Sequence, residues 1–483
     1  MADSAGMPPT SGKLESLPRV LGLFDAVGCV VGSIIGSGIF LKVGKAAGAV
    51  HSFGPAISVW IGVGLVTLCG SLALAELAAM LPRAGGPYVY LREAYGRLPA
   101  FLWGWTEFWV VRTGSIGALS CATVIYLDAI WPMSSLTQGG VAISIVVGLS
   151  IVNVVSTRWG ATLQNISMVV KISFIIGIIC LPMLLGKTDV ANLNPIWPSA
   201  ASPGLLKGVG LAMIAVMWPY DGWINIAPVA EEIKEPERNV PRGLVIGMFI
   251  VITVYVGANV SYHLTLPMDQ VAGIADTVTG QFVKGHEPTE RVAFDLFEVV
   301  FGGTGATIAA LGVMCSTFGA VNSNMLTGPR IFFAMARDGL LPASIRRIHA
   351  VYQTPCNAII IQGAWTTILL VVFYAWKENP KEAFDALTDS VIFAGIIFYG
   401  LSVAAVYVLR WKRPDLPRPY RTWGYPFTPA LLLAAYAAAG VSVLSSRPEE
   451  TAGVVALIAT GMIFYAFSSR SLAAREASSQ SPV

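Results

Sequence analysis

The sequence predicts an all-α polytopic membrane protein of about twelve transmembrane helices, with two inverted five-helix repeats and two further helices at the C-terminal end. Three observations predict this fold class. Only 12% of the 483 residues are charged and 55% are hydrophobic, whereas a soluble domain carries about twice that charged fraction. The apolar residues form long runs of the length that crosses a bilayer. Glycine and proline interrupt the first and the sixth of these runs.

The apolar runs define the expected spans. Stretches such as Ile57–Ala75 and Ala430–Leu444 approach the roughly 20 helical residues that a span requires. A soluble protein with a very apolar core would carry charged residues between shorter segments, and these are missing. The expected spans cover residues 20–48, 53–80, 99–131, 139–156, 161–186, 205–233, 241–266, 299–336, 356–376, 385–410, 427–446 and 451–469.

The charges of the loops predict how the chain crosses the membrane. Basic residues gather before the first span and in every second loop, most densely in Arg410–Arg421 (RWKRPDLPRPYR). The other loops are short and neutral or carry mixed charges. Because basic loops stay in the cytoplasm, we expect both termini on the cytoplasmic side of the membrane. The membrane itself is expected to be the cell (inner) membrane. Residues 1–17 lack an apolar core and a cleavage site, so we expect a cytoplasmic tail rather than a signal peptide.

Two interrupted spans predict the internal organisation of the chain. The first span contains Gly32–Phe40 (GSIIGSGIF) and the sixth contains Trp218–Trp223 (WPYDGW). Glycine favours unwinding, and Pro219 removes a backbone donor. For either segment alone, the alternative is a glycine-lined packing face between helices. The expected division is a first repeat at 18–186, a second at 205–410, accessory helices at 427–469 and a cytoplasmic tail at 470–483.

Helices broken at mid-membrane can bind an α-amino acid through backbone groups alone. N–H groups at the start of a half-helix attract a carboxylate, and carbonyls at the end of a half-helix attract an ammonium. Matched breaks in inverted repeats build such sites in transporters. The expected donors are Ser37, Gly38 and Ile39, and the expected acceptors are the carbonyls of Ser33, Ile34, Trp218 and Tyr220. The complete expected binding set is Ser33, Ile34, Ile35, Gly36, Ser37, Gly38, Ile39, Trp218, Pro219, Tyr220 and Asp221.

Lys171 stands alone among the apolar residues of the fifth span (SMVVKISFIIGIIC). It follows Arg158 by about thirteen residues, or roughly 20 Å of helix, which indicates a deep position. A lysine at that depth is costly and is expected to be functional. The alternative is a side chain that snorkels to the interface. One role is a tethered cation that bridges the first and eighth spans, where a sodium ion would otherwise lie.

Two side chains of the second interruption can shape the surroundings of the ligand. We expect Trp218 to act as a gate over the ligand, whereas Trp223 is expected to pack as an ordinary aromatic residue. Asp221 can favour substrates with cationic side chains, or it can bond its own freed backbone.

Five further polar residues at bilayer depth each leave two interpretations open. Glu76, Glu107 and Arg112 form structural ion pairs and hydrogen bonds between helices, or they relay protons. Asn322 and Asn324 line the transport pathway, or they hydrogen-bond between helices.

Other classes of function find no support in the sequence. No pair of the six cysteines has zinc-site spacing, and the cysteines do not form a disulfide framework. Neither an HExxH nor a GxSxG motif is present. The net charge of +3 gives no indication of a nucleic-acid partner. We therefore expect no enzyme, no cofactor and no metal site.

Together these segments resemble the amino acid–polyamine–organocation superfamily. Within it they look most like the L-type branch, whose eukaryotic members are light chains of heteromeric amino acid transporters. Gly32–Phe40 is similar to that branch's consensus. Tyr220–Trp223 and Glu231–Arg242 (EEIKEPERNVPR) resemble its sixth helix and the following inner loop. Phe318–Pro342 (FGAVNSNMLTGPRIFFAMARDGLLP) resembles its eighth helix.

The resemblance implies a LeuT-like fold, alternating access by rocking of a helical bundle, and sodium-independent transport, often as obligatory exchange. It implies that Lys171 occupies the vacated sodium site and that Trp218 holds the position of an aromatic gate. The loop Trp131–Gly140 lacks the cysteine that links animal members to their heavy chain, so we expect a prokaryotic-type member without a disulfide-linked heavy chain. Asp221 replaces a glycine common in large-neutral carriers, so their substrate range is not carried over.

The predicted function is exchange or uniport of neutral L-amino acids by alternating access. Three alternatives keep the same fold. The protein can be an antiporter of cationic amino acids or polyamines with Asp221 as counter-charge, a proton-coupled amino acid symporter, or a membrane sensor that binds an amino acid without transporting it.

Overall fold

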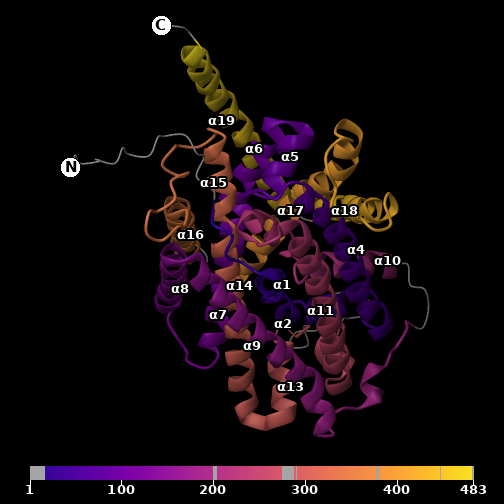
Figure 1. Ribbon diagram of the computed structural model, residues 1–483. Helices are drawn as coiled ribbons and strands as arrows, with labels where there is room; N and C mark the ends of the chain where they lie inside the picture. Colours follow the sequence, from indigo (N-terminus) through magenta and orange to yellow (C-terminus); the bar gives the residue numbers. More distant parts are fainter. Residues whose placement is uncertain are drawn as a thin grey trace, which may run out of the picture.

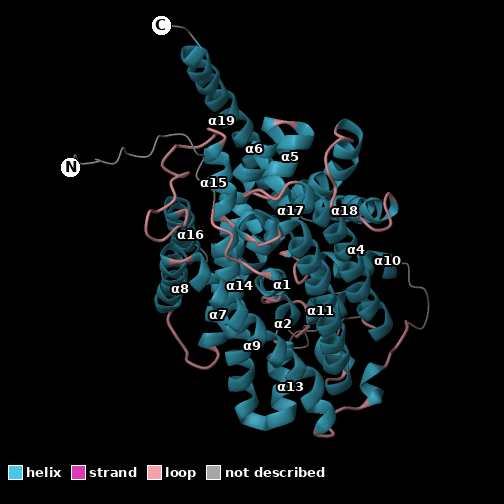
Figure 2. Cartoon of the chain, in the orientation of Figure 1, coloured by secondary structure: helices cyan, strands magenta, loops and turns pink. Residues whose placement is uncertain are grey.

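The computed structural model describes residues 17–198, 204–274, 288–289, 291–376, 380–446 and 448–480. Across these residues the chain is mainly helical, without a strand and with one isolated β-bridge between Leu21 and Ile233 (Figure 2). The α-helices are α1 (Leu23–Ile34), α2 (Gly38–Leu41), α3 (Val43–Val50), α4 (Phe53–Met80), α5 (Pro87–Tyr95), α6 (Arg97–Thr106), α7 (Arg112–Asp128), α8 (Ser135–Val155), α9 (Thr157–Leu184), α10 (Leu205–Met217), α11 (Pro236–Thr265), α12 (Met268–Ala272), α13 (Val292–Phe301), α14 (Gly305–Thr327), α15 (Pro329–Arg337), α16 (Cys356–Trp376), α17 (Pro380–Lys412), α18 (Phe427–Ser446) and α19 (Pro448–Gln480). The other helices are the π-helix η1 (Glu107–Val111) and the 3-10 helices η2 (Val190–Leu193), η3 (Trp223–Glu232) and η4 (Gly302–Thr304).

The number of spans agrees with the sequence. In the described part of the chain, ten helical segments are long and apolar enough to cross a membrane. Two shorter apolar helices, Leu205–Met217 and Thr451–Phe467, correspond to the remaining two expected spans. The predicted fold class, an all-α membrane protein with discontinuous first and sixth helices, is confirmed.

The broken first span lies at the centre of the bundle. α1 packs against α9, α11 and α14, and Figure 1 shows α1 and α2 surrounded by the longer helices. The start of α1 is defined by Asp25, whose Oδ2 accepts the N–H of Gly22 over 2.7 Å and so satisfies one of the free donors of a helix N-terminus. From Ala26 to Ile34 every residue of α1 is buried. A helix that is apolar on all sides can be buried on every side, which fits the position of α1 inside the bundle.

Three differences from the sequence prediction concern segments expected to be loops or tails. α5 forms in the expected inner loop after the second span, and α13 forms in the expected loop before residue 299. α19 continues to Gln480, so the residues expected to be a tail from 470 begin as helix. The short helices α5 and α13 were missed because they carry charged residues and are too short to stand out as apolar runs. Of the expected N-terminal tail, only Leu17 lies within the described residues.

Candidate functional site

The first span is broken between Ile34 and Gly38. α1 ends at Ile34, and α2, a helix of four residues, begins at Gly38. Ser37 is the N-terminal cap residue of α2, but its side chain accepts no hydrogen bond from the backbone of the helix. The first N–H groups of α2 therefore lack the capping partner that usually satisfies such donors.

The sixth span is broken between Met217 and Trp223. α10 ends at Met217, and the 3-10 helix η3 begins at Trp223. Between them the N–H of Asp221 donates to the carbonyl of Trp218 over 3.0 Å, so this break folds into a turn of its own. Gly222 has a φ of +101°, a left-handed conformation that glycine adopts at little cost.

The two breaks touch through their backbones. A Cβ atom on Gly38 would lie 2.5 Å from the Cα of Pro219, and one on Gly222 would lie 2.8 Å from the carbonyl oxygen of Ser33. Both distances are too short for any side chain. The glycines at 38 and 222 are therefore required for the two broken segments to meet.

Residues of both breaks line one buried cavity, which we call the central cavity. Its empty volume is about 340 Å³. The first break contributes Ser33, Ile34, Gly36, Ser37 and Gly38, the second contributes Trp218, Asp221 and Gly222, and neighbouring helices contribute Ser115, Leu119, Asn225 and Asn324.

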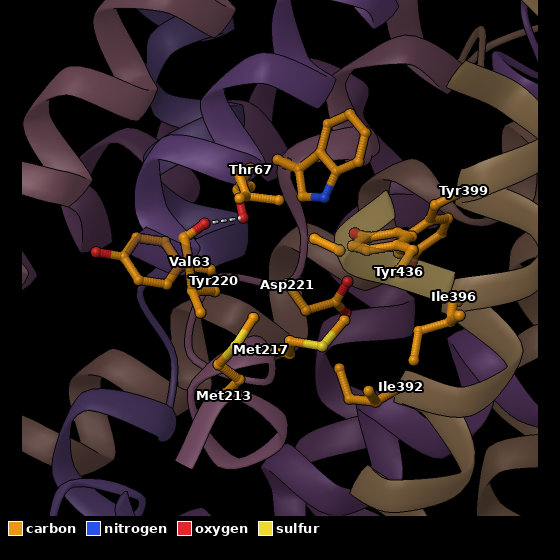
Figure 3. Close-up of a pocket in the computed structure, with 14 residues that line it drawn as sticks. Val63, Thr67, Met213, Met217, Tyr220, Asp221, Ile392, Ile396, Tyr399 and Tyr436 are labelled. Carbon is orange, nitrogen blue, oxygen red and sulfur yellow. Dashed lines mark hydrogen bonds between the residues drawn. The ribbon is translucent and has the colours of Figure 1, made fainter. Parts of the chain in front are cut away.

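Four residues of the expected binding set do not line the central cavity. Ile35 and Ile39 are fully buried at the first break, and Pro219 lies against Gly38. Tyr220 faces a neighbouring cavity instead, shown in Figure 3. The side chains of these four residues pack into the framework of the breaks, and the other seven members of the set line the central cavity.

Asp221 lines both the central cavity and the cavity of Figure 3. In Figure 3 it lies among Met217, Tyr399 and Tyr436, which come from three different helices. Its carboxylate is therefore aimed at groups beyond its own turn. This arrangement makes it a component of the cavity walls rather than only a local backbone partner.

Trp218 lines both the central cavity and a larger one, the vestibule, which has an empty volume of about 1340 Å³. Lys42 and His51 also line the vestibule. The Nε1 of Trp218 donates to the Ser37 hydroxyl over 3.2 Å, and its ring packs edge-on against Phe384 with centroids 6.1 Å apart. Among the described residues, Trp218 is the one that lines both cavities.

Lys171 is 1% exposed, and its ammonium is bound by carbonyls at the end of α1. Its Nζ donates to the oxygens of Gly32 and Ile35 over 2.9 and 2.6 Å. The negative end of a helix dipole favours a cation at this point. A Cβ on Gly319 of α14 would lie 3.0 Å from the Lys171 Cε, so the side chain lies between the first and eighth spans.

Tyr255 of α11 was missed by the sequence analysis. Its hydroxyl contacts the carbonyl oxygen of Ile34 at 3.2 Å and that of Pro219 at 3.1 Å, so it bridges the two breaks. Ser316 of α14 likewise donates to the carbonyl of Gly36 over 2.9 Å. A tyrosine and a serine within apolar spans give little signal, although every freed carbonyl at bilayer depth needs a partner.

These contacts also change the expected set of acceptors. The Ile34 carbonyl already accepts from Tyr255, and the Trp218 carbonyl accepts from Asp221. A carbonyl oxygen has two lone pairs, so each retains capacity for one further donor. The sequence predicted these carbonyls as acceptors for the substrate, but it gave no sign that donors of the protein already bond to them.

The polar residues of the third and eighth spans form a connected network. The Arg112 guanidinium pairs with Glu107 over 2.6 Å and donates to the side chains of Asn324 (2.6 Å) and Thr327 (3.3 Å). Asn324 lines the central cavity. Asn322 instead bonds between helices, because it accepts from Asn153 over 2.9 Å.

Three further ion pairs join helices of the bundle. Arg330 pairs with Glu232 over 2.7 Å, and both side chains are fully buried. Arg337 and Glu231 pair over 3.0 Å. Glu76 pairs with Arg410 over 2.7 Å, so it is part of a structural ion pair.

A family model for amino acid permeases matches residues 21–467. The chain belongs to the amino acid permease family. The resemblance to the amino acid–polyamine–organocation superfamily is thereby confirmed.

Several known transporters are similar to this permease over most of its length. The serine/threonine exchanger SteT of Bacillus subtilis (strain 168) is 30% identical over 429 residues, which cover 87% of this chain and 90% of SteT. Large neutral amino acids transporter small subunit 2 of Homo sapiens is 30% identical over 478 residues, 96% of this chain and 83% of that protein. The b(0,+)-type amino acid transporter 1 of Rattus norvegicus is 28% identical over 475 residues, 96% and 90% of the two chains.

Proposed function

We propose that this permease moves neutral L-amino acids across the membrane by sodium-independent alternating access, as an exchanger or a uniporter. The observation that carries the proposal is the meeting of two broken helices in one buried cavity. The names of the relatives support it, since each describes an amino acid transporter or exchanger.

The α-groups of the substrate are bound by backbone atoms. The carboxylate accepts hydrogen bonds from the N–H groups of Gly38 and Ile39, with the Ser37 hydroxyl as a further donor, because the start of α2 lacks a side-chain cap. The ammonium donates to the carbonyls of Ser33 and Tyr220, with the remaining lone pairs of Ile34 and Trp218 completing its surroundings.

The charge around the breaks supports a neutral substrate side chain. Lys171 and Arg112 lie beside this region, as do Glu107 and Asp221. Their formal charges cancel, with Arg112 close enough to Asp221 to interact electrostatically. A zwitterion with an uncharged side chain leaves this balance unchanged, whereas an added cation or anion would be unpaired at a depth where charge is costly.

Trp218 and Lys171 serve the transport cycle rather than recognition of the side chain. Opening of the Trp218 ring admits substrate from the vestibule, and its closure over Ser37 encloses the substrate. Lys171 supplies the fixed cation that a sodium-dependent transporter would obtain from solution. Lys171 keeps the end of α1 attached to α9 while α14 changes its position during the transport cycle.

The remaining features follow from the same proposal. The chain is a carrier rather than an enzyme and works without a disulfide-linked heavy chain. Residues 18–186 and 205–410 form the inverted repeats, and 427–469 form the accessory helices. The basic loops and both termini face the cytoplasm, which puts the vestibule on the outer face of the cell membrane.

Counterflow in proteoliposomes tests the proposal. Vesicles loaded with unlabelled amino acid should accumulate labelled serine, alanine or leucine without sodium and without a pH gradient. Arginine and putrescine should compete poorly. Stronger competition by these cations would support a cationic substrate, an absolute need for a pH gradient would support proton coupling, and binding without flux would leave only a sensor.

A further inference from the structure

A second pocket lies apart from the central cavity, in the side of the bundle where α6, α15, α16 and α19 come together (Figure 1). Its empty volume is about 670 Å³, and its walls include Trp105, Phe108, Trp109 and Phe332. We call this space the aromatic pocket. Among the described residues, every lining side chain is apolar or aromatic, and no charged group lines the pocket.

The mouth of the aromatic pocket opens to the surroundings of the bundle. Ile361 of α16 and Phe464 of α19 line it and are 39% and 46% exposed. Because these helices cross the membrane, their exposed faces meet hydrocarbon rather than water. A hollow of this size with only apolar walls matches a flexible hydrocarbon chain, since a polar ligand would lose its hydrogen bonds there.

One edge of the aromatic pocket continues directly into a basic loop. Ile345 lines the pocket, and the next two residues, Arg346 and Arg347, are exposed. The sequence from Gly339 to Trp376 contains no aspartate or glutamate. In the described part of the chain, neither guanidinium pairs with a carboxylate. A pair of uncompensated arginines at the end of an apolar pocket is complementary to a phosphate.

We propose that this region binds an anionic phospholipid, with an acyl chain in the aromatic pocket and the headgroup phosphate on Arg346 and Arg347. The loop that carries both arginines lies at the end of the bundle where α5, α6, α15 and α19 gather (Figure 1). An acyl chain extends from that end toward the middle of the membrane along the aromatic walls.

The lipid would contact helices that carry the internal ion pairs. Phe108 and Trp109 belong to η1, the π-helix that also contains Glu107, and π-helical turns inside α-helices often mark functional sites. Glu107 pairs with Arg112, which reaches Asn324 at the central cavity. An acyl chain in the aromatic pocket would therefore pack against η1, the helix whose Glu107 pairs with Arg112 next to the central cavity.

Lipid titration of the purified full chain, followed by native mass spectrometry, tests the proposal. The probes are phosphatidylglycerol and phosphatidylcholine with identical acyl chains. We expect phosphatidylglycerol to bind about twenty-five-fold more tightly, since each of two arginines contributes about fivefold near an anionic headgroup. Addition of inorganic phosphate at matched concentration should not displace it, because the acyl chain supplies part of the binding.

Two pairs of variants separate the two halves of the site. Ile361→Trp fills the mouth and should abolish binding of both lipids, while Ile360→Trp, at a neighbouring position that is 54% exposed and outside the pocket, should not. R346E/R347E should remove the preference for phosphatidylglycerol, while R158E/R242E, with the same change in net charge at other exposed arginines, should keep it.

Several results would overturn the proposal. Equal affinity for the two lipids, or an intact preference in R346E/R347E, would exclude the headgroup site. Unchanged binding in Ile361→Trp would exclude the aromatic pocket, and displacement by inorganic phosphate alone would reduce the site to a phosphate contact. The arginine variant lies wholly on an exposed loop, so it remains informative if the tryptophan variant does not fold.

Discussion

Both broken helices of this permease leave backbone groups free at the central cavity, but different contacts stabilise the two breaks. The break in the first span is supported from outside, because Lys171, Tyr255 and Ser316 bond its carbonyls from three other spans. The break in the sixth span is more self-contained, although it shares the support of Tyr255 through the Pro219 carbonyl. It closes a turn through Asp221 and Trp218 and continues into the 3-10 helix η3.

The residues that the two breaks expose also differ. The first break presents backbone groups and small side chains to the central cavity, whereas the sixth presents Trp218 and Asp221. We infer that the first break recognises what all α-amino acids share and that the sixth determines access and side-chain preference. Variants at each break, and at the groups that support them, test this division.

The largest effect is expected for Gly38→Val. The new Cβ would lie 2.5 Å from the Cα of Pro219, so the two breaks would be forced apart and the carboxylate position would be filled. We expect counterflow to fall to background, since overpacking of this kind costs about 1–3 kcal/mol or more. Gly62→Val is the control, because a Cβ there meets nothing within 4 Å. Normal uptake by Gly38→Val would refute the site.

The next largest effect is expected for Lys171→Ala, which removes an external support of the first break. Hydrogen bonds to a charged group contribute about 1.5–3 kcal/mol each, so we expect the exchange rate to fall about tenfold or more. Substrate binding should change little, because the ammonium bonds to carbonyls outside the central cavity. Binding measurements and exchange in both directions check this, with the exposed Lys187→Ala as control. Unaltered kinetics in both directions would remove Lys171 from the mechanism.

Tyr255→Phe should have a smaller effect, because it removes one neutral hydroxyl that joins the breaks. A neutral hydrogen bond contributes about 0.5–1.5 kcal/mol, so we expect the ratio of exchange rate to KM to fall about three- to tenfold. Tyr262→Phe is a close control on the same helix, since its buried hydroxyl has no hydrogen-bond partner among the residues that the structure describes. Equal losses in the two variants would show that the bridge between the breaks is unimportant.

The smallest effect is expected for Trp218→Phe, which keeps an aromatic ring at the gate and loses only the bond to the Ser37 hydroxyl. We expect KM to change about fivefold at most, in line with one neutral hydrogen bond. Ser37→Ala should give a similar change, and the double variant should be no worse than either single one. If the effects of the two single variants add up in the double variant, Trp218 and Ser37 act independently. That result would count against Trp218 as a gate that closes over Ser37.

The sequence was most informative where the determining interactions are local. A run of apolar residues specifies a span, and a dense group of glycines or a proline weakens the helix at that point. Both breaks and the burial of Lys171 were therefore predicted, while the gating role of Trp218 stays a prediction. Helices such as α5 were missed because their amphipathic pattern is short and only packing against the bundle reveals their buried face.

The sequence by itself determined that this is a membrane protein of about twelve helices with matched interruptions in the first and sixth. Only the tertiary structure decided which freed carbonyls the protein already occupies. The bond between Lys171 and Gly32 joins residues 139 positions apart, and that between Tyr255 and Ile34 joins residues 221 apart. Such contacts depend on how the helices pack, which no local pattern encodes. The same reason explains why Asp221 was recognised as unusual in the sequence, while its position between two cavities emerged only from the folded chain.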